Sequence, residues 1–273
     1  MSNFKGKKVL ITGGASGIGK IMGRLVLERG AELIIWDVDN KNIDETFAEF
    51  TKLGKVAIYC IDVSKIDHVI EAAARVKIEV GKVDILINNA GIVVGKYFHE
   101  HNHADIANTI NINTLSSMYV TLEFLPEMMT SHNGHICNIA SLAGLISNPK
   151  MSVYAASKWA IIGWSDSLRL EMKKLKTHVR VTTVNPYYIN TGMFAGIKSI
   201  IPVLEPETAA GKIIKAIEND RISLSMPWSM RVVRFFQGLL PISWFDTIVG
   251  KWLGVYRTMD NFTGHSNELK TKS

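Results

Sequence analysis

The sequence predicts an α/β fold, in which a doubly wound parallel sheet of about seven strands carries helices on both faces. Short runs rich in β-branched residues alternate with longer amphipathic segments from the start of the chain, and strands separated by helices are typical of a parallel sheet. Apolar runs such as residues 85–87, Ile-Leu-Ile, indicate strands that are buried on both sides. Because the chain has no internal repeat, low-complexity segment or linker, we expect one domain over residues 1–273.

Each expected strand is a short apolar run that ends in a turn or at a longer amphipathic segment. The expected strands are residues 9–12, 32–36, 56–61, 84–88, 135–139, 179–185 and 222–226. The expected helices are at about residues 17–29, 41–52, 64–80, 104–129, 152–174 and 206–219. Ser64 is a good N-cap residue, so we expect it to begin the third helix. After Pro186 the pattern loosens, and residues 190–273 are expected to form a substrate loop and a C-terminal segment of the same domain.

Composition and charge argue against several classes of protein. With 47% hydrophobic and 21% charged residues, the chain has the composition of a globular protein. Its net charge of +6 comes from scattered lysines rather than a basic stripe, so we expect no nucleic-acid partner. The cysteines, Cys60 and Cys137, fall in separate expected strands, and we expect both to be reduced core residues. Residues 1–8 are polar and no long apolar run follows, which predicts a cytoplasmic protein without signal peptide or transmembrane helix.

A glycine-rich turn links the first expected strand to the first expected helix. It reads Thr12-Gly13-Gly14-Ala15-Ser16-Gly17-Ile18-Gly19. Glycines allow positive φ and let backbone amides come close to a pyrophosphate, while the helix N-terminus adds partial positive charge. Gly17 is the expected close-approach position and Gly19 the helix-packing position. Such a turn also occurs for structural reasons alone, but its place between a strand and a helix favours a dinucleotide.

Asp37 stands at the end of the second expected strand, 18 residues after Gly19. This is close to the spacing of about 20 for an acid that binds the adenosine ribose. A carboxylate there accepts hydrogen bonds from the 2′-hydroxyl and repels a 2′-phosphate, and neither Ser16 nor Val38 is basic. The alternative is that Asp37 only ends a strand. Together with the glycine turn, the pattern predicts NAD as the cofactor, with NADP less favoured.

Tyr154 and Lys158 lie four residues apart in the helix expected at residues 152–174. This spacing puts the phenol and the ammonium on one helix face, one turn apart, and no other tyrosine has a lysine four residues later. Several polar and small residues precede the pair in the chain: Asp62, residues 88–91, Asn113 and Ser141. Each stands near the carboxyl end of an expected strand or on a helix that faces it, which is where ligands bind to an open parallel sheet.

In their order along the chain, these motifs resemble those of the short-chain dehydrogenase/reductase family, over residues from about 7 to 193. The resemblance implies a Rossmann-type fold. It implies four catalytic residues, which are Asn113, Ser141, Tyr154 and Lys158. It also implies which residues contact the cofactor, and among them Asp62 and Val63 would contact the adenine. The implied cofactor contacts are Gly13, Ser16, Gly17, Ile18, Gly19, Asp37, Asp62, Val63, Asn89, Ala90, Gly91, Tyr154, Lys158, Pro186, Ile189 and Thr191.

The resemblance assigns a role to each catalytic side chain. Tyr154 is the general acid in reduction and the general base in oxidation, and Ser141 hydrogen-bonds the substrate oxygen. A free phenol has a pKa near 10, and Lys158 with the positive nicotinamide ring is expected to pull the pKa of Tyr154 toward neutrality. Lys158 also holds the nicotinamide ribose, and Asn113 positions a water that links Lys158 to solvent.

The loop after Pro186 departs from the family pattern. The resemblance implies that this loop closes on the nicotinamide carboxamide, through the backbone of Ile189 and the side chain of Thr191. The glycine that usually follows the proline is replaced by Tyr187. We expect Tyr187 to add an aromatic wall near the nicotinamide ring.

Two further segments, residues 35–39 and 189–193, are similar to a subgroup of retinol and hydroxysteroid dehydrogenases. The candidate pocket residues are largely apolar and include no fixed cation: Val93, Val94, Leu142, Leu145, Ile146, Tyr187, Tyr188, Met193 and Phe194. The alternative is that several of them are ordinary core residues. The expected substrate contacts are Ser141, Leu142, Tyr154, Tyr187 and Met193. We therefore predict a hydrophobic alcohol, such as a steroid, retinoid or fatty alcohol, or its ketone or aldehyde. A reductase of smaller carbonyl compounds is the alternative.

Two other features admit more than one interpretation. His99, His101 and His103 alternate as metal ligands on a strand do, but their flanks predict a polar loop and the chemistry needs no metal, so we expect none. Residues 228–257 mix aromatic with basic residues: Trp228, Phe235, Phe236, Trp244, Phe245 and Trp252 with Arg231, Arg234, Lys251 and Arg257. Such a segment suits peripheral contact with a membrane, or it caps the pocket or packs on another subunit, which we favour. The resemblance implies a homodimer or homotetramer.

Two rival functions belong to other classes. A catalytically silent sensor or scaffold that binds NAD would not need Ser141, Tyr154 and Lys158. A methyltransferase or another nucleotide enzyme on a related sheet would transfer no hydride. We therefore predict an NAD-dependent oxidoreductase.

Overall fold

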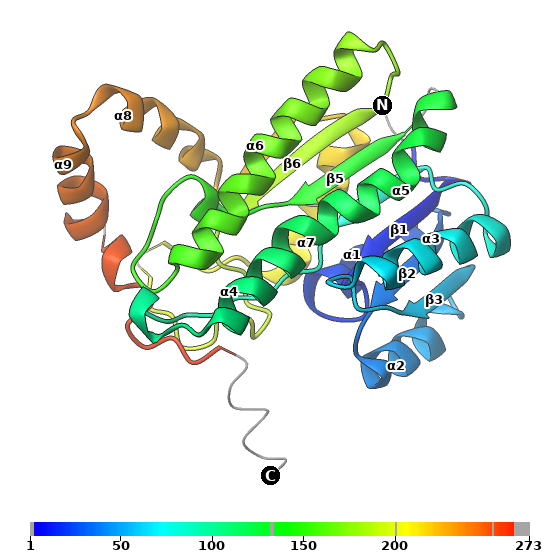
Figure 1. Cartoon of the computed structure of the whole chain (residues 1–273), viewed down its shortest axis with the longest axis horizontal. Helices are drawn as coiled ribbons and strands as arrows, with labels where there is room; N and C mark the ends of the chain where they lie inside the picture. The colour runs from blue at the N-terminus through cyan, green and yellow to red at the C-terminus, as the bar shows by residue number, and fades with distance from the viewer. Residues whose placement is uncertain (1–2, 132–133, 200, 253, 265–273) are drawn as a thin grey trace.

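Seven strands pair into a parallel sheet in the computed structural model, which describes residues 3–131, 134–199, 201–252 and 254–264 (Figure 1). The strands are β1 Lys8–Thr12, β2 Glu32–Asp37, β3 Val56–Cys60, β4 Ile85–Asn88, β5 His135–Ile139, β6 Arg180–Pro186 and β7 Ser223–Met226. They lie in the order β3-β2-β1-β4-β5-β6-β7, and each neighbouring pair is parallel. The predicted single Rossmann-type domain is confirmed, and no strand end differs from the predicted one by more than one residue.

Helices cover both faces of the sheet, as predicted. They are α1 Gly17–Leu27, α2 Asn40–Phe50, α3 Ile66–Glu79, α4 His103–Ile110, α5 Ser116–Thr130, α6 Ser152–Lys174, α7 Pro206–Glu218, α8 Val233–Leu239 and α9 Ile242–Phe245. The apolar sides of α1, α2 and α7 pack in one buried cluster, and those of α3, α5 and α6 pack in another on the opposite face. In Figure 1, α8 and α9 stand clear of the sheet, on the side away from α2 and β3.

Successive residues of the central strands point into different layers. Val9 and Ile11 of β1 join the cluster beneath α1 and α7, whereas Leu10 lies in the cluster beneath α3 and α5. All three are fully buried. Burial on both sides explains why these strands are continuous apolar runs in the sequence.

The winding of the chain reverses at β1. This strand pairs with β2 on one side and with β4 on the other, so the connections that follow β1 and β4 leave the sheet in opposite directions. In an open parallel sheet, such a switch point forms a crevice outside the carboxyl ends of the strands. The residues predicted to bind and react stand after β1, β4, β5 and β6, so the topology brings them to this one edge.

The helix predicted at residues 104–129 is interrupted. It is divided into α4 and α5 by a π-helical turn at Asn111–Leu115. Asn113 lies in this turn, and its buried amide bonds the backbone of Ile92 and the hydroxyl of Ser157 instead of facing solvent. Wide turns of this kind are frequent at functional sites.

Two predictions about single residues are wrong. Ser64 does not cap α3, because its hydroxyl donates to Asp62 Oδ1 at 2.6 Å and the helix begins at Ile66 with Lys65 as N-cap. Cys60 is exposed rather than buried, since it ends β3 at the edge of the sheet. Cys137, in β5, is buried as predicted.

Candidate active site

The glycine turn between β1 and α1 has the shape needed to hold a phosphate. Gly13 and Gly17 have positive φ, of 63° and 50°, and a Cβ added at Gly19 would overlap the carbonyl oxygen of Gly13. Ser16 is the N-cap of α1, yet its side chain makes no capping hydrogen bond, and the first helical turn carries no acidic residue. The amides of this helix end are therefore open to an anion, as the pyrophosphate of a dinucleotide requires.

Asp37 is held against the glycine turn. Its Oδ2 accepts a hydrogen bond from the backbone N–H of Ala15 at 2.9 Å, and its Oδ1 accepts from the N–H of Val38 at 2.8 Å and of Asp39 at 3.2 Å. Only 9% of the residue is exposed. The carboxylate is therefore a fixed negative charge at the end of β2, beside the phosphate turn.

The connection after β4 is tied to the glycine turn and to Asn113. Asn89 donates through Nδ2 to the carbonyls of Thr12 and Gly13, both at 3.0 Å. Asn113 accepts from the N–H of Ile92 at 2.8 Å and donates to its carbonyl at 2.9 Å. These bonds fix residues 89–92 between the glycine turn and the π-helical turn that carries Asn113. The water that Asn113 is expected to position stays a prediction.

Tyr154, Lys158 and Ser141 converge on one cavity. Tyr154 and Lys158 stand one turn apart on α6, with the Lys158 Nζ 5.7 Å from the centre of the Tyr154 ring. Lys158 Nζ donates to the carbonyl of Ile139, at the end of β5, at 2.9 Å. Ser141 Oγ accepts from the N–H of Ala143 at 3.1 Å, which leaves its hydroxyl proton free to point to Tyr154 or to a substrate oxygen.

Burial shifts the pKa of both members of the pair. It raises the pKa of the Tyr154 phenol, and the hydrogen bond with Ser141 acts in the opposite direction. Burial also lowers the pKa of Lys158 to about 8. Both shifts have the same cause, because removal from water disfavours the charged form of each group. The predicted displacement of the Tyr154 pKa toward neutrality is therefore not produced by the protein groups alone.

The loop after β6 closes the cavity on its apolar side. The Tyr187 hydroxyl lies 2.6 Å from Ser199 Oγ, so the residue that replaces the usual glycine reaches across the loop to Ser199. Tyr188 packs edge-on against Phe194, with ring centres 4.9 Å apart, and Phe194 packs on Tyr154 at 6.1 Å. Aromatic side chains thus line this side of the cavity, and the position of Tyr187 near a nicotinamide ring stays a prediction.

The cavity brings together most of the predicted site residues. Those that line it are Gly13, Ser16, Gly17, Ile18, Asn89, Ala90, Gly91, Ser141, Leu142, Ile146, Tyr154, Lys158, Pro186, Tyr187, Tyr188, Ile189, Thr191, Met193 and Phe194. Residues from both halves of the chain thus form one continuous cavity. The glycine turn lies at its polar end and the aromatic side chains lie at its apolar end.

Other predicted residues stand outside the lining of this cavity. Gly19 packs against the carbonyl of Gly13, and Asn113 bonds the backbone of Ile92. Asp37 bonds the glycine turn at Ala15. Asp62 accepts from Ser64, and Val63 is packed in the core, so their expected contact with adenine stays a prediction. Three residues expected in the pocket do not line it: Val93, Val94 and Leu145. Leu145 packs instead in a small buried cluster with Ile161 and Ile162 of α6.

Sequence reasoning missed several lining residues, among them Asn148, Ile201, Met230 and Val255. Asn148 donates through Nδ2 to the Tyr188 hydroxyl at 3.0 Å and to Thr258 Oγ1 at 3.1 Å. These bonds fasten the C-terminal segment over the cavity. No local motif marks such residues, because they meet only when residues 146–149, 187–204 and 228–258 fold together.

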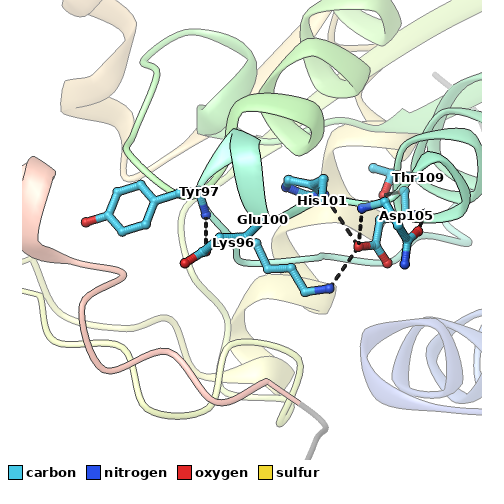
Figure 2. A network of polar contacts seen from close by, with 7 residues as sticks. Lys96, Tyr97, Glu100, His101, Asp105 and Thr109 are labelled. Carbon is cyan, nitrogen blue, oxygen red and sulfur yellow. Dashed lines mark hydrogen bonds and ion pairs between the residues drawn. The ribbon is translucent and has the colours of Figure 1, made fainter.

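The alternating histidines do not point to a common centre. Figure 2 shows His101 turned toward Asp105. Asp105 Oδ2 also forms an ion pair with Lys96 Nζ at 2.8 Å. His99 instead stacks on the ring of Tyr97. Among the residues that the structure describes, no three His, Cys, Asp or Glu side chains are grouped so that they could hold a metal ion.

The C-terminal segment lies partly over the cavity, to which it contributes Met230 and Val255. This favours the expectation that it caps the pocket. The side chains of Arg231, Arg234, Lys251 and Trp252, named in that expectation, lie outside the described part of the structure. Among the described residues, no helix is both long and apolar enough to cross a membrane.

Comparisons with known proteins agree with this architecture. A family model described as short chain dehydrogenase matches residues 7–200. Epidermal retinol dehydrogenase 2 of Mus musculus is 36% identical over 97% of this chain and 88% of its own. Estradiol 17-beta-dehydrogenase 11 of Pongo abelii is 34% identical over 86% of this chain and 80% of its own.

Solved structures give the same result for the fold. A short chain dehydrogenase/reductase from Burkholderia phymatum in complex with NAD has a TM-score of 0.79 at 24% identity, over 88% of this chain and 96% of that one. A metagenomic short-chain oxidoreductase in complex with NADP has a TM-score of 0.70 at 27% identity, over 82% and 96%.

Proposed function

This chain belongs to the short-chain dehydrogenase/reductase family, in the subgroup similar to retinol and hydroxysteroid dehydrogenases, and we propose that it interconverts a hydrophobic alcohol and its ketone or aldehyde with NAD. One observation carries the proposal. Ser141, Tyr154 and Lys158 line the same cavity as the glycine turn, which leads into the N-terminus of α1, where no side chain caps the helix. A protein that only binds a dinucleotide has no use for an acid–base group at the apolar end of its cofactor site.

The protein's part in the reaction is to handle a proton and a developing negative charge. A bound nicotinamide dinucleotide would supply or accept the hydride. Tyr154 gives its hydroxyl proton to the substrate oxygen during reduction and takes it back during oxidation. Ser141 donates a hydrogen bond from its free hydroxyl to the same oxygen and so stabilises the charge that develops there.

Lys158 sets the electrostatic conditions for Tyr154. With a pKa of about 8, Lys158 is mostly charged at neutral pH and stands beside the Tyr154 ring. Burial keeps the phenol protonated, which suits an acid in reduction. In oxidation the phenol must lose its proton, and a bound nicotinamide ring, which is positive in its oxidised form, would supply the rest of the stabilisation.

Asp37 supports NAD over NADP. Its carboxylate is fixed by three backbone N–H groups at the end of β2, where the adenosine ribose of a dinucleotide on the glycine turn would lie. A carboxylate accepts from a 2′-hydroxyl but repels a 2′-phosphate. We expect NAD to bind at least tenfold more tightly than NADP, and Asp37→Asn to reduce that preference.

The aromatic end of the cavity supports an apolar substrate. Met193 and Phe194 line it together with both tyrosines of the loop after β6, and the only ammonium among its lining residues is that of Lys158. An apolar lining with few polar groups favours a steroid, retinoid or long-chain alcohol over a small polar one.

A panel of alcohols and carbonyl compounds tests the proposal, with formation or loss of NADH and NADPH followed by absorbance. We expect kcat/KM to be highest for large apolar alcohols with NAD. Efficient turnover of small polar alcohols would contradict the substrate class. If no compound is oxidised or reduced although NAD binds, the protein is a silent dinucleotide-binding protein instead.

A further inference from the structure

The segment that runs from Trp228 through α8 and α9 exposes large apolar side chains that the rest of the described structure does not cover. They are Trp228, Phe235, Phe236, Leu239, Ile242 and Trp244, with exposed fractions between 45% and 79%. We call these six residues the outer apolar face. Folded proteins seldom leave so many large apolar side chains exposed within one short segment unless they contact a partner or a lipid surface.

A second cavity lies directly beneath this face. It is bounded by Gln237, Ile242 and Phe245 of α8 and α9, and by residues 146–149 on its inner side. Ile146 and Asn148 line both this cavity and the one that holds Tyr154. Ile242 is 79% exposed and also lines the second cavity. The two cavities are therefore neighbours that meet at Ile146 and Asn148, and the second lies between the outer apolar face and the cavity of Tyr154.

The segment is held in this position by specific bonds. Gln237 donates through Nε2 to the carbonyl of Leu145 at 2.7 Å, and Thr258 bonds Asn148. Inner residues such as Phe245 are buried, while the outer face remains uncovered. Because inner and outer sides differ, α8 and α9 form a two-sided layer rather than a loose tail.

Charge distinguishes between the occupants that could cover the face. Residues 228–257 contain four basic residues and one acidic residue, Asp246, and the whole chain carries a charge of +6. Exposed tryptophans among basic residues suit the headgroup region of a bilayer, where the indole lies at the interface and anionic lipids attract the cations. Two copies of this basic segment would repel each other across a two-fold axis.

We propose that the outer apolar face of α8 and α9 docks on an anionic lipid surface, and that the second cavity admits the apolar substrate from the lipid to Tyr154. Docking follows from exposure and charge, whereas the passage of substrate rests on the proposed function. A lipid-borne substrate would then reach the site without crossing water.

Sedimentation of the full chain with vesicles tests the docking. We compare phosphatidylcholine alone with about three parts phosphatidylcholine to one part phosphatidylserine. The variant Phe235→Ser with Trp244→Ser removes two exposed rings that line neither cavity. Its matched control, Phe47→Ser with Ile78→Ser, removes exposed apolar side chains from α2 and α3 instead.

We expect the wild-type chain and the control to bind the anionic vesicles, and the α8–α9 variant to bind at least tenfold more weakly. Equal binding by the two double variants would overturn the proposal. A wild-type chain that does not bind the vesicles would also overturn it. If, in addition, the α8–α9 variant shifts a dimer to a monomer, the face is a subunit contact instead.

Turnover separates the failure of the docking from the failure of the proposed function. With a long apolar alcohol held in anionic vesicles, the α8–α9 variant should lose about tenfold in kcat/KM, whereas the same alcohol on a soluble carrier should react normally. Equal loss from both sources would contradict delivery from lipid. If vesicles bind but no alcohol reacts from either source, the docking survives and the proposed function fails.

Ser147 offers a test of the passage itself, because it is exposed and lines only the second cavity. Ser147→Trp should lower kcat/KM for long alcohols at least fivefold, while vesicle binding and NAD affinity stay unchanged. Ser147→Ala is the control and should have no effect. Unchanged turnover in Ser147→Trp would show that substrate takes another route.

Discussion

The glycine turn at residues 13–19 and the C-terminal segment that begins at Trp228 both contribute to the lining of one cavity but are held by different forces. The turn is shaped by backbone geometry, since Gly19 leaves no room for a Cβ against Gly13. The C-terminal segment is fastened by a few side-chain bonds, such as those of Gln237 and Asn148, and its outer side is uncovered.

This difference implies that the two ends tolerate change to different degrees. A rigid backbone site loses its ligand when one atom is added, because the overlap cannot relax without moving the helix. A site held by separate side-chain bonds loses about 1 kcal/mol at a time. The cofactor end is thus expected to change little among variants that still bind NAD, whereas the substrate end can be retuned in small steps.

The largest effect is expected at Tyr154, which lines the cavity that both segments share. Tyr154→Phe removes the hydroxyl that we propose as the proton donor while leaving the ring packed on Phe194. We expect kcat to fall by about a thousandfold, with the affinity for NAD and the circular dichroism spectrum unchanged. Tyr97→Phe, an exposed tyrosine outside the cavity, is the control. A Tyr154→Phe enzyme within tenfold of wild type would refute the assigned role.

The next largest effect concerns the rigid end. Gly19→Ala places a Cβ against the Gly13 carbonyl, so we expect NAD to bind about a hundredfold more weakly and the free energy of unfolding to fall by about 1–3 kcal/mol. Gly211→Ala in α7 meets no atom within 4 Å and should stabilise the helix by up to about 1 kcal/mol. Calorimetry and urea unfolding measure both. Equal behaviour of the two variants would show that the turn is not rigid.

A pH effect is expected from the buried ammonium at the junction. Burial lowers the pKa of Lys158 from 10.5 to about 8 in the folded state, so between these values the unfolded chain binds more protons than the folded one. The free energy of unfolding should therefore rise with pH across this window, by up to about 3 kcal/mol. Lys158→Met removes this gain, because it has no proton to lose.

Urea unfolding of wild type and Lys158→Met, below pH 8 and near pH 10.5, checks this prediction. The difference in unfolding free energy between the two proteins should shift in favour of wild type at the higher pH. Groups other than Lys158 titrate in both proteins and cancel in the comparison. Parallel pH profiles would mean that Lys158 keeps an ordinary pKa.

The smallest effect belongs to the adjustable end. Tyr187→Phe keeps the aromatic wall but removes the bond to Ser199, so we expect KM for a large apolar alcohol to rise about threefold. The value of kcat should not change. Tyr187→Gly, which restores the residue usual in the family, should raise KM further. A fall in kcat for Tyr187→Phe would place Tyr187 in the chemical step instead.

The contrast between the two ends also explains how far the sequence could be interpreted. The strands, the phosphate turn and the Tyr154–Lys158 pair were predictable, because hydrophobic period, glycine geometry and helical spacing are local properties of the chain. Asn113 was placed on a helix correctly, but not in a π-helical turn, since the bonds that hold its side chain come from Ile92 and Ser157.

The predictions that are wrong depend on contacts that no sequence pattern fixes. Cys60 is apolar in character yet lies at the exposed edge of the sheet, and Ser64 bonds Asp62 rather than the helix end. Val93 and Leu145 were expected in the pocket, while Met230 and Val255 line it instead. No pattern within residues 228–258 shows which side of the segment faces the cavity.

The central claim is that hydrogen moves directly between the alcohol carbon and the dinucleotide beside Tyr154, and isotope transfer tests it most directly. An apolar alcohol carrying deuterium on its hydroxyl-bearing carbon is incubated with NAD and the enzyme, and the nucleotide product is examined by mass spectrometry. The account predicts NADH that carries the deuterium. Unlabelled NADH, or an oxidised alcohol without any NADH, would contradict it.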